Sequence, residues 1–555
     1  MHKPARKQGR NLQLASSAPR LGAGLCHESL METTLTGTSI IGSNRGKEGG
    51  ATFQAFNPQT GEAIEPAFHS ASLEELNTAA QLAEHARIPY GGLSGKQRAV
   101  FLRAIADNIE ALGNTLIERA TLETSLPDAR FVGERGRTCG QLRMFADLLD
   151  EGSWVDARVD HAIPDRQPIP KPDVRSMLRS LGPVAVFCAS NFPLAYSVAG
   201  GDTASALAAG CPVIVIAHTA HPGTAELVGS AIAKAATDLG MPEGVFSLLF
   251  SESYEIGQAL VRHPAIKAVG FTGSRRGGRA LMDVAAARPE PIPVYTEMSS
   301  VNPTFFLPSA IEKRGESLAA GLHASVTGGV GQFCTKPGLV FVPEGAEGEQ
   351  FIDAFDPLIE GSQPAPLLTD GISRAFNDAV GKRKLESAGF TFNSVSDLPG
   401  FSVNPGSFEV SAENFLMAPD LSDEIFGPTT LFIKSSMDQL LDIARGLEGQ
   451  LTASIHGDEA DLIEYADLIA ILETKVGRLI FNGFSTGVEV CPSMVHGGPY
   501  PATSDSRSTA VGSRAITRFA RLVCFQNFPD AALPEEVKDA NPLGIWRMVD
   551  GEFGN

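Results

Sequence analysis

Cys334 stands in the glycine-rich stretch 326–338, close behind Gly328, Gly329 and Gly331. Small residues ahead of a thiol let the backbone approach the group that the thiol attacks. They also allow backbone N–H groups to point inward and stabilise a developing oxyanion. The pattern indicates a thiol nucleophile that attacks a carbonyl carbon. Taken alone it also fits an inert buried cysteine, because free cysteine often packs as a small hydrophobic residue.

Two polar residues elsewhere have the chemistry that such a thiol needs. Glu297, in Tyr-Thr-Glu-Met-Ser-Ser, is a candidate general base. Asn191, in Ala-Ser-Asn-Phe-Pro, follows an apolar strand and is a candidate amide donor to an oxyanion. Each has an ordinary alternative, since a glutamate at a strand edge is usually solvated and an asparagine before Phe-Pro is typical of a turn.

A possible phosphate site follows another apolar strand. Phe-Thr-Gly-Ser at 271–274 ends that strand, and Gly277 and Gly278 open the next helix. Helix N-termini bind anions through free N–H groups and the helix dipole, so we expect a pyrophosphate site here. The usual G-x-G-x-x-G is absent, and an ordinary tight turn remains the alternative.

Composition narrows the class of protein. The 555 residues suggest about two to four domains. The net charge of −19 argues against nucleic acid as a partner, because phosphate binding requires clustered Lys and Arg. The seven cysteines are scattered without a C-x-x-C pair, so we expect no disulfide scaffold, no metal site and a reducing, cytoplasmic location. No apolar run is long enough to span a membrane as a helix, and we expect no membrane partner.

The middle of the chain alternates between strand and helix patterns. Apolar runs bounded by turn residues predict strands at 184–187, 212–216, 245–249 and 268–271, and helical patterns separate them. This alternation predicts an α/β fold in which helices cover both faces of a parallel sheet. Before it, residues 72–88, 95–120 and 127–150 have helical spacing. After it, we expect a second α/β block at 300–490 and a short strand at 521–525.

Residues 1–30 differ from the rest of the chain. They carry five Lys and Arg residues and no acid before Glu28. A basic, acid-poor leader is typical of organelle transit peptides. We expect a disordered basic leader instead, because the segment has no amphipathic helical pattern.

Five motifs in one order resemble the aldehyde dehydrogenase superfamily over about residues 45–530. They are Asn-Phe-Pro at 191–193, Phe-Thr-Gly-Ser at 271–274, Glu-Met at 297–298, Gly-Gln-Phe-Cys at 331–334 and Glu-Ile-Phe-Gly-Pro at 424–428. The stretches 295–303, 481–490 and 496–503 are similar to 2,5-dioxovalerate dehydrogenases, also called α-ketoglutarate semialdehyde dehydrogenases. The same branch includes NADP-preferring fatty aldehyde dehydrogenases.

The resemblance implies an aldehyde dehydrogenase-like α/β fold. A Rossmann-type cofactor domain would comprise 31–155 and 182–298, and a catalytic domain 299–510. A small β oligomerisation element would comprise 156–181 and 511–530, followed by a C-terminal tail at 531–555. It also implies a homodimer or homotetramer.

The resemblance further implies a covalent mechanism. The Cys334 thiolate attacks the aldehyde, and the Asn191 amide with the Cys334 N–H holds the oxyanion. Hydride passes to a nicotinamide, and Glu297 activates the water that hydrolyses the resulting thioester. The implied cofactor contacts are Gly273, Ser274 and Gly278 near the pyrophosphate, Thr219 near the adenosine ribose, Glu424 at the nicotinamide ribose and Phe426 beside the nicotinamide.

One departure leaves the cofactor open between NADP and NAD. Ile216 replaces the lysine that the family usually places after this strand, and an apolar side chain cannot bond to a ribose or 2′-phosphate. Thr219 replaces a glutamate that repels a 2′-phosphate in many NAD-specific members. His218 and His221 are possible substitutes for the lysine. Taken together, the residues at 216 and 219 slightly favour NADP over NAD.

The expected reaction is oxidation of α-ketoglutarate semialdehyde to 2-oxoglutarate. Its far carboxylate needs a cation, for which we expect Arg143, with Arg518 as the alternative, and Phe192 as a further substrate contact. A surface ion pair is the ordinary explanation of Arg143. The alternatives are a fatty aldehyde dehydrogenase, and a non-catalytic scaffold protein that has lost its cofactor lysine.

Overall fold

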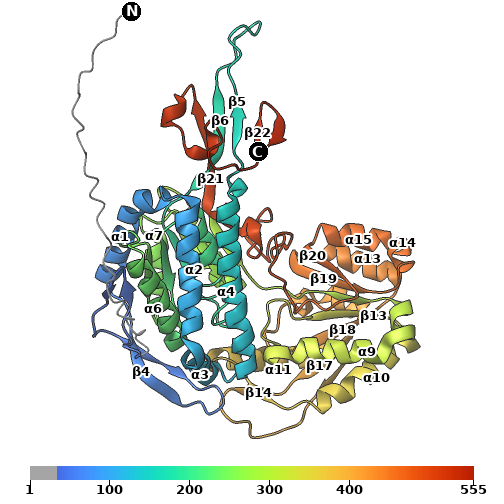
Figure 1. The fold of residues 1–555 in the computed structure, drawn as a ribbon. Helices are drawn as coiled ribbons and strands as arrows, with labels where there is room; N and C mark the ends of the chain where they lie inside the picture. Colours follow the sequence, from blue (N-terminus) through green and yellow to red (C-terminus); the bar gives the residue numbers. More distant parts are fainter. Residues whose placement is uncertain (1–33) are drawn as a thin grey trace, which may run out of the picture. The chain divides into compact units, whose positions relative to one another are not determined.

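The computed structural model describes residues 34–555, which form three sheets of five or more strands and two small two-stranded sheets (Figure 1). The leader expected at 1–30 lies outside the described residues. Within 34–555, every helix is either too short or too polar to cross a bilayer.

The first sheet has seven strands and a parallel centre. In spatial order they are β11 (Val294–Glu297), β10 (Ala268–Thr272), β7 (Val184–Phe187), β8 (Val213–Ile216), β9 (Phe246–Leu249), β1 (Ile40–Ile41) and β2 (Asn44–Arg45). The five strands from β11 to β9 are parallel, and β1 pairs antiparallel to β9. The four strands expected in the alternating stretch are all present, and the predicted α/β fold class is confirmed.

Helices cover both faces of this sheet. One face packs against α1 (Leu73–Gly91), α7 (Tyr254–Arg262) and α8 (Arg275–Ala286). Beyond the other face lie α2 (Gly95–Ala111), α3 (Gly113–Thr124), α4 (Asp128–Glu151), α5 (Gly201–Ala209) and α6 (Pro222–Asp238). The expected helix at 95–120 is two helices, because Gly113 adopts a φ of 57° that a right-handed helix cannot continue through. The hairpin of β3 (Thr52–Phe56) and β4 (Ala63–His69) precedes α1.

The second sheet also has seven strands. In spatial order they are β15 (Gly389–Phe392), β17 (Gly406–Ser411), β18 (Thr429–Ser435), β13 (Leu339–Pro343), β12 (Thr304–Phe306), β19 (Gln450–His456) and β20 (Val476–Phe481), with only β15 antiparallel among them. The pair β14 (Ala365–Pro366) and β16 (Ser402–Val403) lies apart from it.

Neighbouring residues of the second sheet point into different cores. Phe305 packs towards α11 (Asp370–Glu386), α12 (Ala412–Met417), α13 (Met437–Gly446) and α15 (Ala466–Glu473), next to the short α14 (Asp461–Glu464). Phe306 packs towards α9 (Pro308–Thr327) and α10 (Ala346–Glu360). This alternation follows from the period of two residues along a strand.

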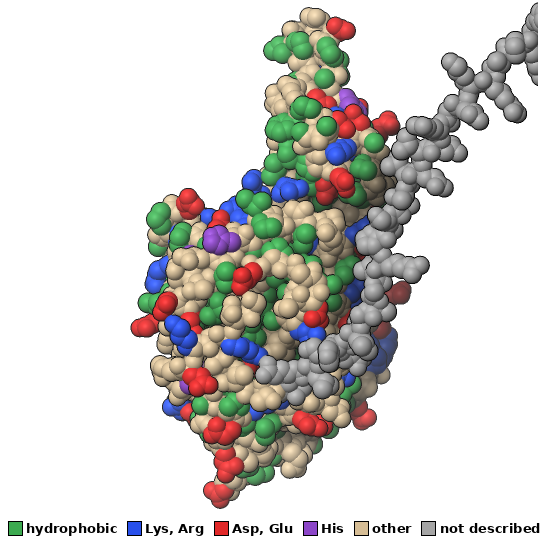
Figure 2. Space-filling view, turned by 60° about the vertical axis from the view of Figure 1, so that its left-hand side comes forward, with side chains coloured by type: hydrophobic (Ala, Val, Ile, Leu, Met, Phe, Trp, Pro, Cys, Tyr) green, Lys and Arg blue, Asp and Glu red, His purple; other side chains and the backbone are tan. Residues whose placement is uncertain are grey.

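The third sheet extends away from α2 and α4 (Figure 1). Its strands, in order, are β21 (Ala520–Gln526), β6 (Val174–Ser180), β5 (Arg158–Asp160), β22 (Arg547–Val549) and β23 (Glu552–Gly554). Residues 531–555, which we expected to be a C-terminal tail, contain β22 and β23. The sequence did not indicate these strands, because each has three residues and no apolar alternation. Figure 2 shows hydrophobic side chains on this projecting part, among acidic ones.

The site described below lies where two sheet edges meet. Asn191, Thr219, Ser274 and Glu297 follow or end strands of the first sheet, so they lie at its carboxyl edge. The segment 331–338, which contains Cys334, leads into β13, and Glu424 precedes β18, so both lie at the amino edge of the second sheet.

Candidate active site

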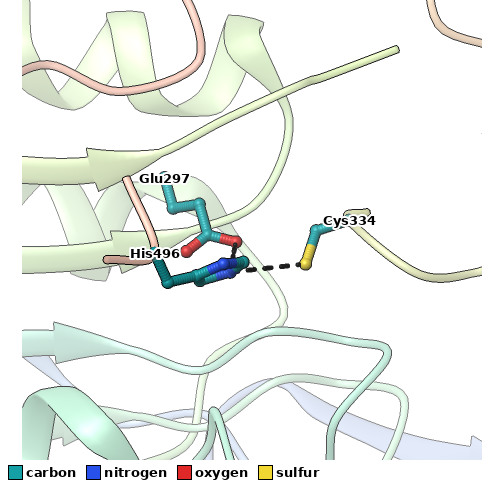
Figure 3. Close-up of side chains that lie close together, drawn as sticks. All are labelled: Glu297, Cys334 and His496. Atoms are coloured by element: carbon teal, nitrogen blue, oxygen red, sulfur yellow. Dashed lines mark hydrogen bonds and ion pairs between the residues drawn. The ribbon is translucent and has the colours of Figure 1, made fainter. Parts of the chain in front are cut away.

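Three side chains from distant parts of the chain meet in one cluster (Figure 3). Glu297 ends β11, Cys334 lies in the turn after the 3-10 helix η2 (Gly328–Gly331), and His496 lies in the loop after β20. The Nε2 atom of His496 is 2.9 Å from Oε1 of Glu297 and 3.7 Å from Sγ of Cys334. Sequence reasoning missed His496, although it included the segment 496–503 in the family resemblance.

Backbone pairing holds the His496 loop against β11. The N–H of Met298 donates to the carbonyl of Ala502 at 2.8 Å, and Glu297 forms an isolated antiparallel bridge with Thr503. His496 itself donates its N–H to Oγ1 of Thr509 at 2.9 Å. The imidazole and the carboxylate are therefore fixed to each other by the backbone as well as by their own hydrogen bond.

Side chains hold the carbonyl groups around the thiol. Nδ2 of Asn302 donates to the carbonyls of Cys334 and Lys336 at 2.9 and 3.0 Å. Oγ of Ser485 donates to the carbonyl of Thr335 at 2.6 Å. Gly331 has a φ of 66°, and a Cβ there would lie 2.3 Å from the Gly427 carbonyl, so only glycine fits.

The donors for an oxyanion lie beside this turn. No residue within 34–555 accepts a hydrogen bond from the N–H of Cys334, so that donor is available. Nδ2 of Asn191 donates to the carbonyl of Gln332 at 2.7 Å, and its second N–H remains for a ligand. The structure thus places Asn191 next to the Cys334 turn, as the sequence led us to expect.

A partly buried ion pair, formed by Arg130 and Glu134, fixes the turn that carries Asn191. Oε1 of Glu134 accepts hydrogen bonds from the backbone N–H groups of Leu194 and Ala195, both at 2.9 Å. Arg130 pairs with the other oxygen of Glu134 at 3.1 Å and donates to the carbonyl of Asn191 at 3.2 Å. Asn191 is therefore held on both sides by side chains of α4.

The electrostatics favour a charged Glu297 and a neutral Cys334. Burial raises the pKa of Glu297, but the electrostatic attraction and hydrogen bond of His496, together with Cys334 and Arg518, outweigh burial and leave that pKa below its usual value. Burial and then the negative charge of Glu297 hold the pKa of Cys334 well above its usual value. Oε2 of Glu297 is buried without a partner in the described chain, so it is free to accept a proton from a thiol or water.

We assign the ring proton of His496 to Nε2. That nitrogen faces the Glu297 carboxylate, whereas Nδ1 is buried and has no partner within 34–555. A buried lone pair without a donor costs less than a carboxylate without one. In this tautomer His496 orients Glu297 and stabilises its charge.

The donor atoms of Glu297, Cys334 and His496, which lie within 4.8 Å of one another, are also ligand types that zinc accepts.

The expected pyrophosphate residues form a helix N-terminus that fits an anion. Ser274 is the N-cap of α8, and its Oγ accepts from the N–H of Gly277 at 3.1 Å. The first turn of α8 contains no acid and contains Arg275 and Arg276. Gly273 donates its N–H to the Glu297 carbonyl at 3.0 Å, which ties this turn to the end of β11 that carries the Glu297 carboxylate. These groups suit the diphosphate of a dinucleotide.

Gly278 has a packing reason to be glycine, because a Cβ there would lie 2.7 Å from the sulfur of Met298.

Lys336 fixes the loop that carries Glu424 and Phe426, since its Nζ donates to the carbonyls of Ile425 and Thr429 at 3.1 and 2.7 Å. Burial raises the pKa of Glu424, and the charge of Lys336 opposes that effect. The nucleophile turn and the expected nicotinamide-ribose residue are thus physically linked.

The adenosine end of the expected cofactor site has no cation at Ile216, which is buried with Leu249 in the core of the first sheet. Thr219 is half-buried in the loop after β8. His218 stacks on His221 at 5.6 Å, and burial lowers the pKa of His218 to about 3. A neutral His218 at physiological pH offers no charge to a 2′-phosphate.

The structure does not place Arg143 among the residues of the cluster. Its guanidinium donates to Glu110 at 2.6 Å and to Asp107 at 2.7 Å on the surface of α2. This is the ion pair that the sequence left as the ordinary explanation, so we withdraw Arg143 as the substrate cation. Arg518 is paired too, with Asp202 at 2.6 Å.

Phe192 lies next to the nucleophile turn. Its ring packs against Phe333 at 5.5 Å and against Tyr196 at 5.2 Å. The guanidinium of Arg130 lies 4.5 Å from the centre of the Phe192 ring. Phe192 thus lines the region around Cys334.

Comparison with known proteins identifies the family. A model of the aldehyde dehydrogenase family matches residues 45–499. The alpha-ketoglutaric semialdehyde dehydrogenase 2 of Azospirillum brasilense is 49% identical over 522 residues, which cover 93% of this chain and 99% of that protein. The alpha-ketoglutaric semialdehyde dehydrogenase of Acinetobacter baylyi is 44% identical over 521 residues, covering 93% and 98%. The chain therefore belongs to the aldehyde dehydrogenase family and is an oxidoreductase.

Solved structures agree in fold. Aldehyde dehydrogenase C of Pseudomonas syringae, solved with NAD+ and octanal, matches with a TM-score of 0.74 at 20% identity over 89% of this chain and 98% of that chain. The NADP-dependent glyceraldehyde-3-phosphate dehydrogenase of Bacillus halodurans, solved with NADP, matches with a TM-score of 0.74 at 20% identity over 89% and 100%. At 20% identity, these two matches show a shared fold and nothing beyond it.

We predict that Glu297→Gln makes the Cys334 thiol more reactive while it slows aldehyde oxidation. The substitution removes a negative charge that raises the thiol pKa, so the thiolate fraction at pH 8 increases, about tenfold for each unit by which the pKa falls. The measurement is the rate of iodoacetamide labelling of the Cys334 peptide by mass spectrometry. Labelling at or below the wild-type rate would contradict the assigned electrostatics.

The matched control is Glu316→Gln, which removes an exposed carboxylate from α9. Its Cys334 labelling rate should equal that of the wild type at every pH. In the wild type, labelling should continue to rise as the pH passes 9, because the thiol pKa lies well above its usual value.

Proposed function

We propose that this protein oxidises α-ketoglutarate semialdehyde (2,5-dioxopentanoate) to 2-oxoglutarate, with NADP or NAD as the hydride acceptor. The observation that carries the reaction type is the meeting of Cys334, Glu297 and Asn191 around one small region. The substrate is inferred from the names of two relatives that are 49% and 44% identical over nearly their whole lengths.

The first half of the reaction forms a bond to sulfur. Cys334 loses its proton to Glu297, whose Oε2 has no other partner within 34–555, and Sγ attacks the aldehyde carbon. The N–H of Cys334 and the amide of Asn191 then hold the oxyanion. A single donor of this kind contributes about 3 kcal/mol to the transition state. When bound, the oxidised form of NADP or NAD would supply the acceptor for the hydride that leaves as the oxyanion collapses and the thioester forms.

The second half releases the acid. Glu297, once it has passed its proton to solvent, accepts a proton from a water molecule, and the hydroxide attacks the thioester carbon. His496 keeps the carboxylate oriented and charged in this step. Collapse of the tetrahedral intermediate expels the Cys334 thiolate and yields the carboxylic acid.

Other groups would bind the cofactor. The N-terminus of α8, with Ser274 as its cap, would hold the diphosphate, and Glu424 with Phe426 would lie at the nicotinamide riboside. Because Ile216 and a neutral His218 provide no charge at the adenosine ribose, recognition of a 2′-phosphate would rest on the absence of repulsion at Thr219.

We also propose that the protein is a cytoplasmic homodimer or homotetramer assembled through the third sheet. Leu522 on β21 is 64% exposed and Phe553 on β23 is 65% exposed, which is unusual for large apolar side chains. We expect light scattering of the wild type to give twice or four times the mass of one chain. A monomeric mass at working concentration would contradict the assembly.

An assay of cofactor reduction by the purified protein tests the proposed reaction. We expect turnover of α-ketoglutarate semialdehyde with NADP+ or NAD+, and a lower kcat/KM for hexanal and for succinate semialdehyde. Higher kcat/KM for hexanal would favour a fatty aldehyde dehydrogenase. Cys334→Ala should abolish oxidation. Absence of turnover with every pair of aldehyde and cofactor would favour the non-catalytic scaffold protein.

A further inference from the structure

Two arginines converge on one short segment beside the nucleophile. Nη1 of Arg137, on α4, donates to the carbonyl of Val488 at 2.7 Å. Nη1 of Arg478, on β20, donates to the carbonyl of Gly487 at 2.6 Å. Since these two carbonyls are adjacent in the chain, the two guanidinium groups face the same stretch of backbone.

Contacts on one side connect Arg478 to the nucleophile turn. Nη2 of Arg478 donates to the carbonyl of Ser485 at 2.6 Å, and Oγ of Ser485 donates to the carbonyl of Thr335 at 2.6 Å. Thr335 directly follows Cys334. Arg478 is therefore separated from the nucleophile turn by a single residue.

Contacts on the other side connect Arg137 to the imidazole of His496. Nη2 of Arg137 lies 3.3 Å from the hydroxyl of Tyr196, and its guanidinium is 5.6 Å from the centre of the Tyr196 ring. The ring of Tyr196 is 6.1 Å from that of His496. Both cations thus border the region in which the aldehyde reacts.

Neither positive charge is balanced by a carboxylate within residues 34–555. Arg137 and Arg478 form no ion pair there, and their hydrogen-bond partners are backbone carbonyls and a tyrosine hydroxyl. Nε of Arg478 is buried and has no partner at all in this range. The neighbouring Arg130 and Arg518, by contrast, pair with Glu134 and Asp202.

The electrostatic effects agree with this proximity. Burial and the Glu297 charge raise the pKa of Cys334, and Arg137 opposes them. Burial lowers the pKa of Arg478, the ionisable groups of Cys334 and Tyr196 oppose that effect, and the charge of Arg137 adds to it. The two arginines therefore repel each other, a cost that an anion between them would offset.

We propose that Arg137 and Arg478 together bind the distal carboxylate of a short aldehyde acid, and that they select such a substrate over a neutral aldehyde. This inference rests on the proposed function and assigns its substrate specificity to two residues. A guanidinium has five N–H donors in a planar fork, and each arginine uses only two of its nitrogens in the contacts described. A carboxylate can therefore bind without breaking them.

The test compares Arg137→Met and Arg478→Met with the wild type on α-ketoglutarate semialdehyde and hexanal. We expect kcat/KM for the semialdehyde to fall about 10- to 100-fold, mostly through KM, which is the range for losing a charged hydrogen bond. For hexanal, kcat/KM should stay within about threefold of the wild type. Arg137→Lys and Arg478→Lys keep the charge without the fork and should fall between these limits.

The matched control is Arg103→Met, which removes a surface arginine of α2 that pairs with Asp147 and Asp150. It should leave both substrates unaffected. An equal loss on both substrates in the Arg137 and Arg478 variants, or no loss on either, would overturn the proposal. A selective loss of semialdehyde activity in Arg143→Met instead would return the assignment to Arg143.

Calorimetric titration with 2-oxoglutarate separates this proposal from the proposed function, because it requires no turnover. The wild type and Arg103→Met should bind 2-oxoglutarate, and the two Met variants should bind it at least about tenfold more weakly. If the wild type oxidises hexanal but not the semialdehyde, the proposed substrate is wrong. Even then, weaker 2-oxoglutarate binding in the Met variants supports the anion site, and unchanged or absent binding refutes it.

Discussion

A buried carboxylate that must remain charged beside a thiol is the constraint on which this active site depends. Burial alone would neutralise Glu297, and a neutral acid cannot take a proton from a thiol or from water. The hydrogen bond from Nε2 of His496, at 2.9 Å, keeps it ionised. The same charge suppresses the thiolate of Cys334, so in the proposed mechanism the thiol stays protonated until Glu297 and the oxyanion donors act together.

The architecture makes this arrangement possible by opposing two sheet edges. The carboxyl edge of the first sheet supplies Asn191, Ser274 and Glu297, and such edges are where open α/β sheets usually bind ligands. The amino edge of the second sheet supplies the Cys334 turn and the Glu424 loop, which Lys336 joins. Because each side is held by its own hydrogen bonds, the groups of the proposed mechanism are fixed before substrate arrives, and that preorganisation is what electrostatic catalysis requires.

The central strands of the first sheet and three residues of the candidate site were predictable from the sequence. The alternation of short apolar runs and helices located the central strands of the first sheet, since buried parallel strands are apolar on both faces. Cys334, Glu297 and Asn191 were recognisable because they stand in motifs of fixed order. His496 had no such local signal: its partners are distant in sequence, and only the pairing of Met298 with Ala502 brings it to the carboxylate.

The arginines illustrate the limit of sequence reasoning. Arg137 and Arg143 lie six residues apart on α4, so they point about 120° apart around the helix. Only Arg137 shares the stripe of Arg130, seven residues earlier, which packs on Phe192. That spacing was a usable signal, but which face of α4 meets the nucleophile depends on tertiary packing.

The most direct test of the central claim is the mass of the enzyme trapped between its two half-reactions. Glu297→Gln would be mixed with α-ketoglutarate semialdehyde and oxidised cofactor, quenched in acid and digested. The larger thiolate fraction expected in this variant replaces the proton transfer to Glu297 in the first half-reaction. If Cys334 is the nucleophile and Glu297 the base for hydrolysis, the peptide that contains Cys334, and no other, therefore carries the acyl group. An unmodified Cys334 peptide, or an acyl group on a different residue, would contradict the mechanism.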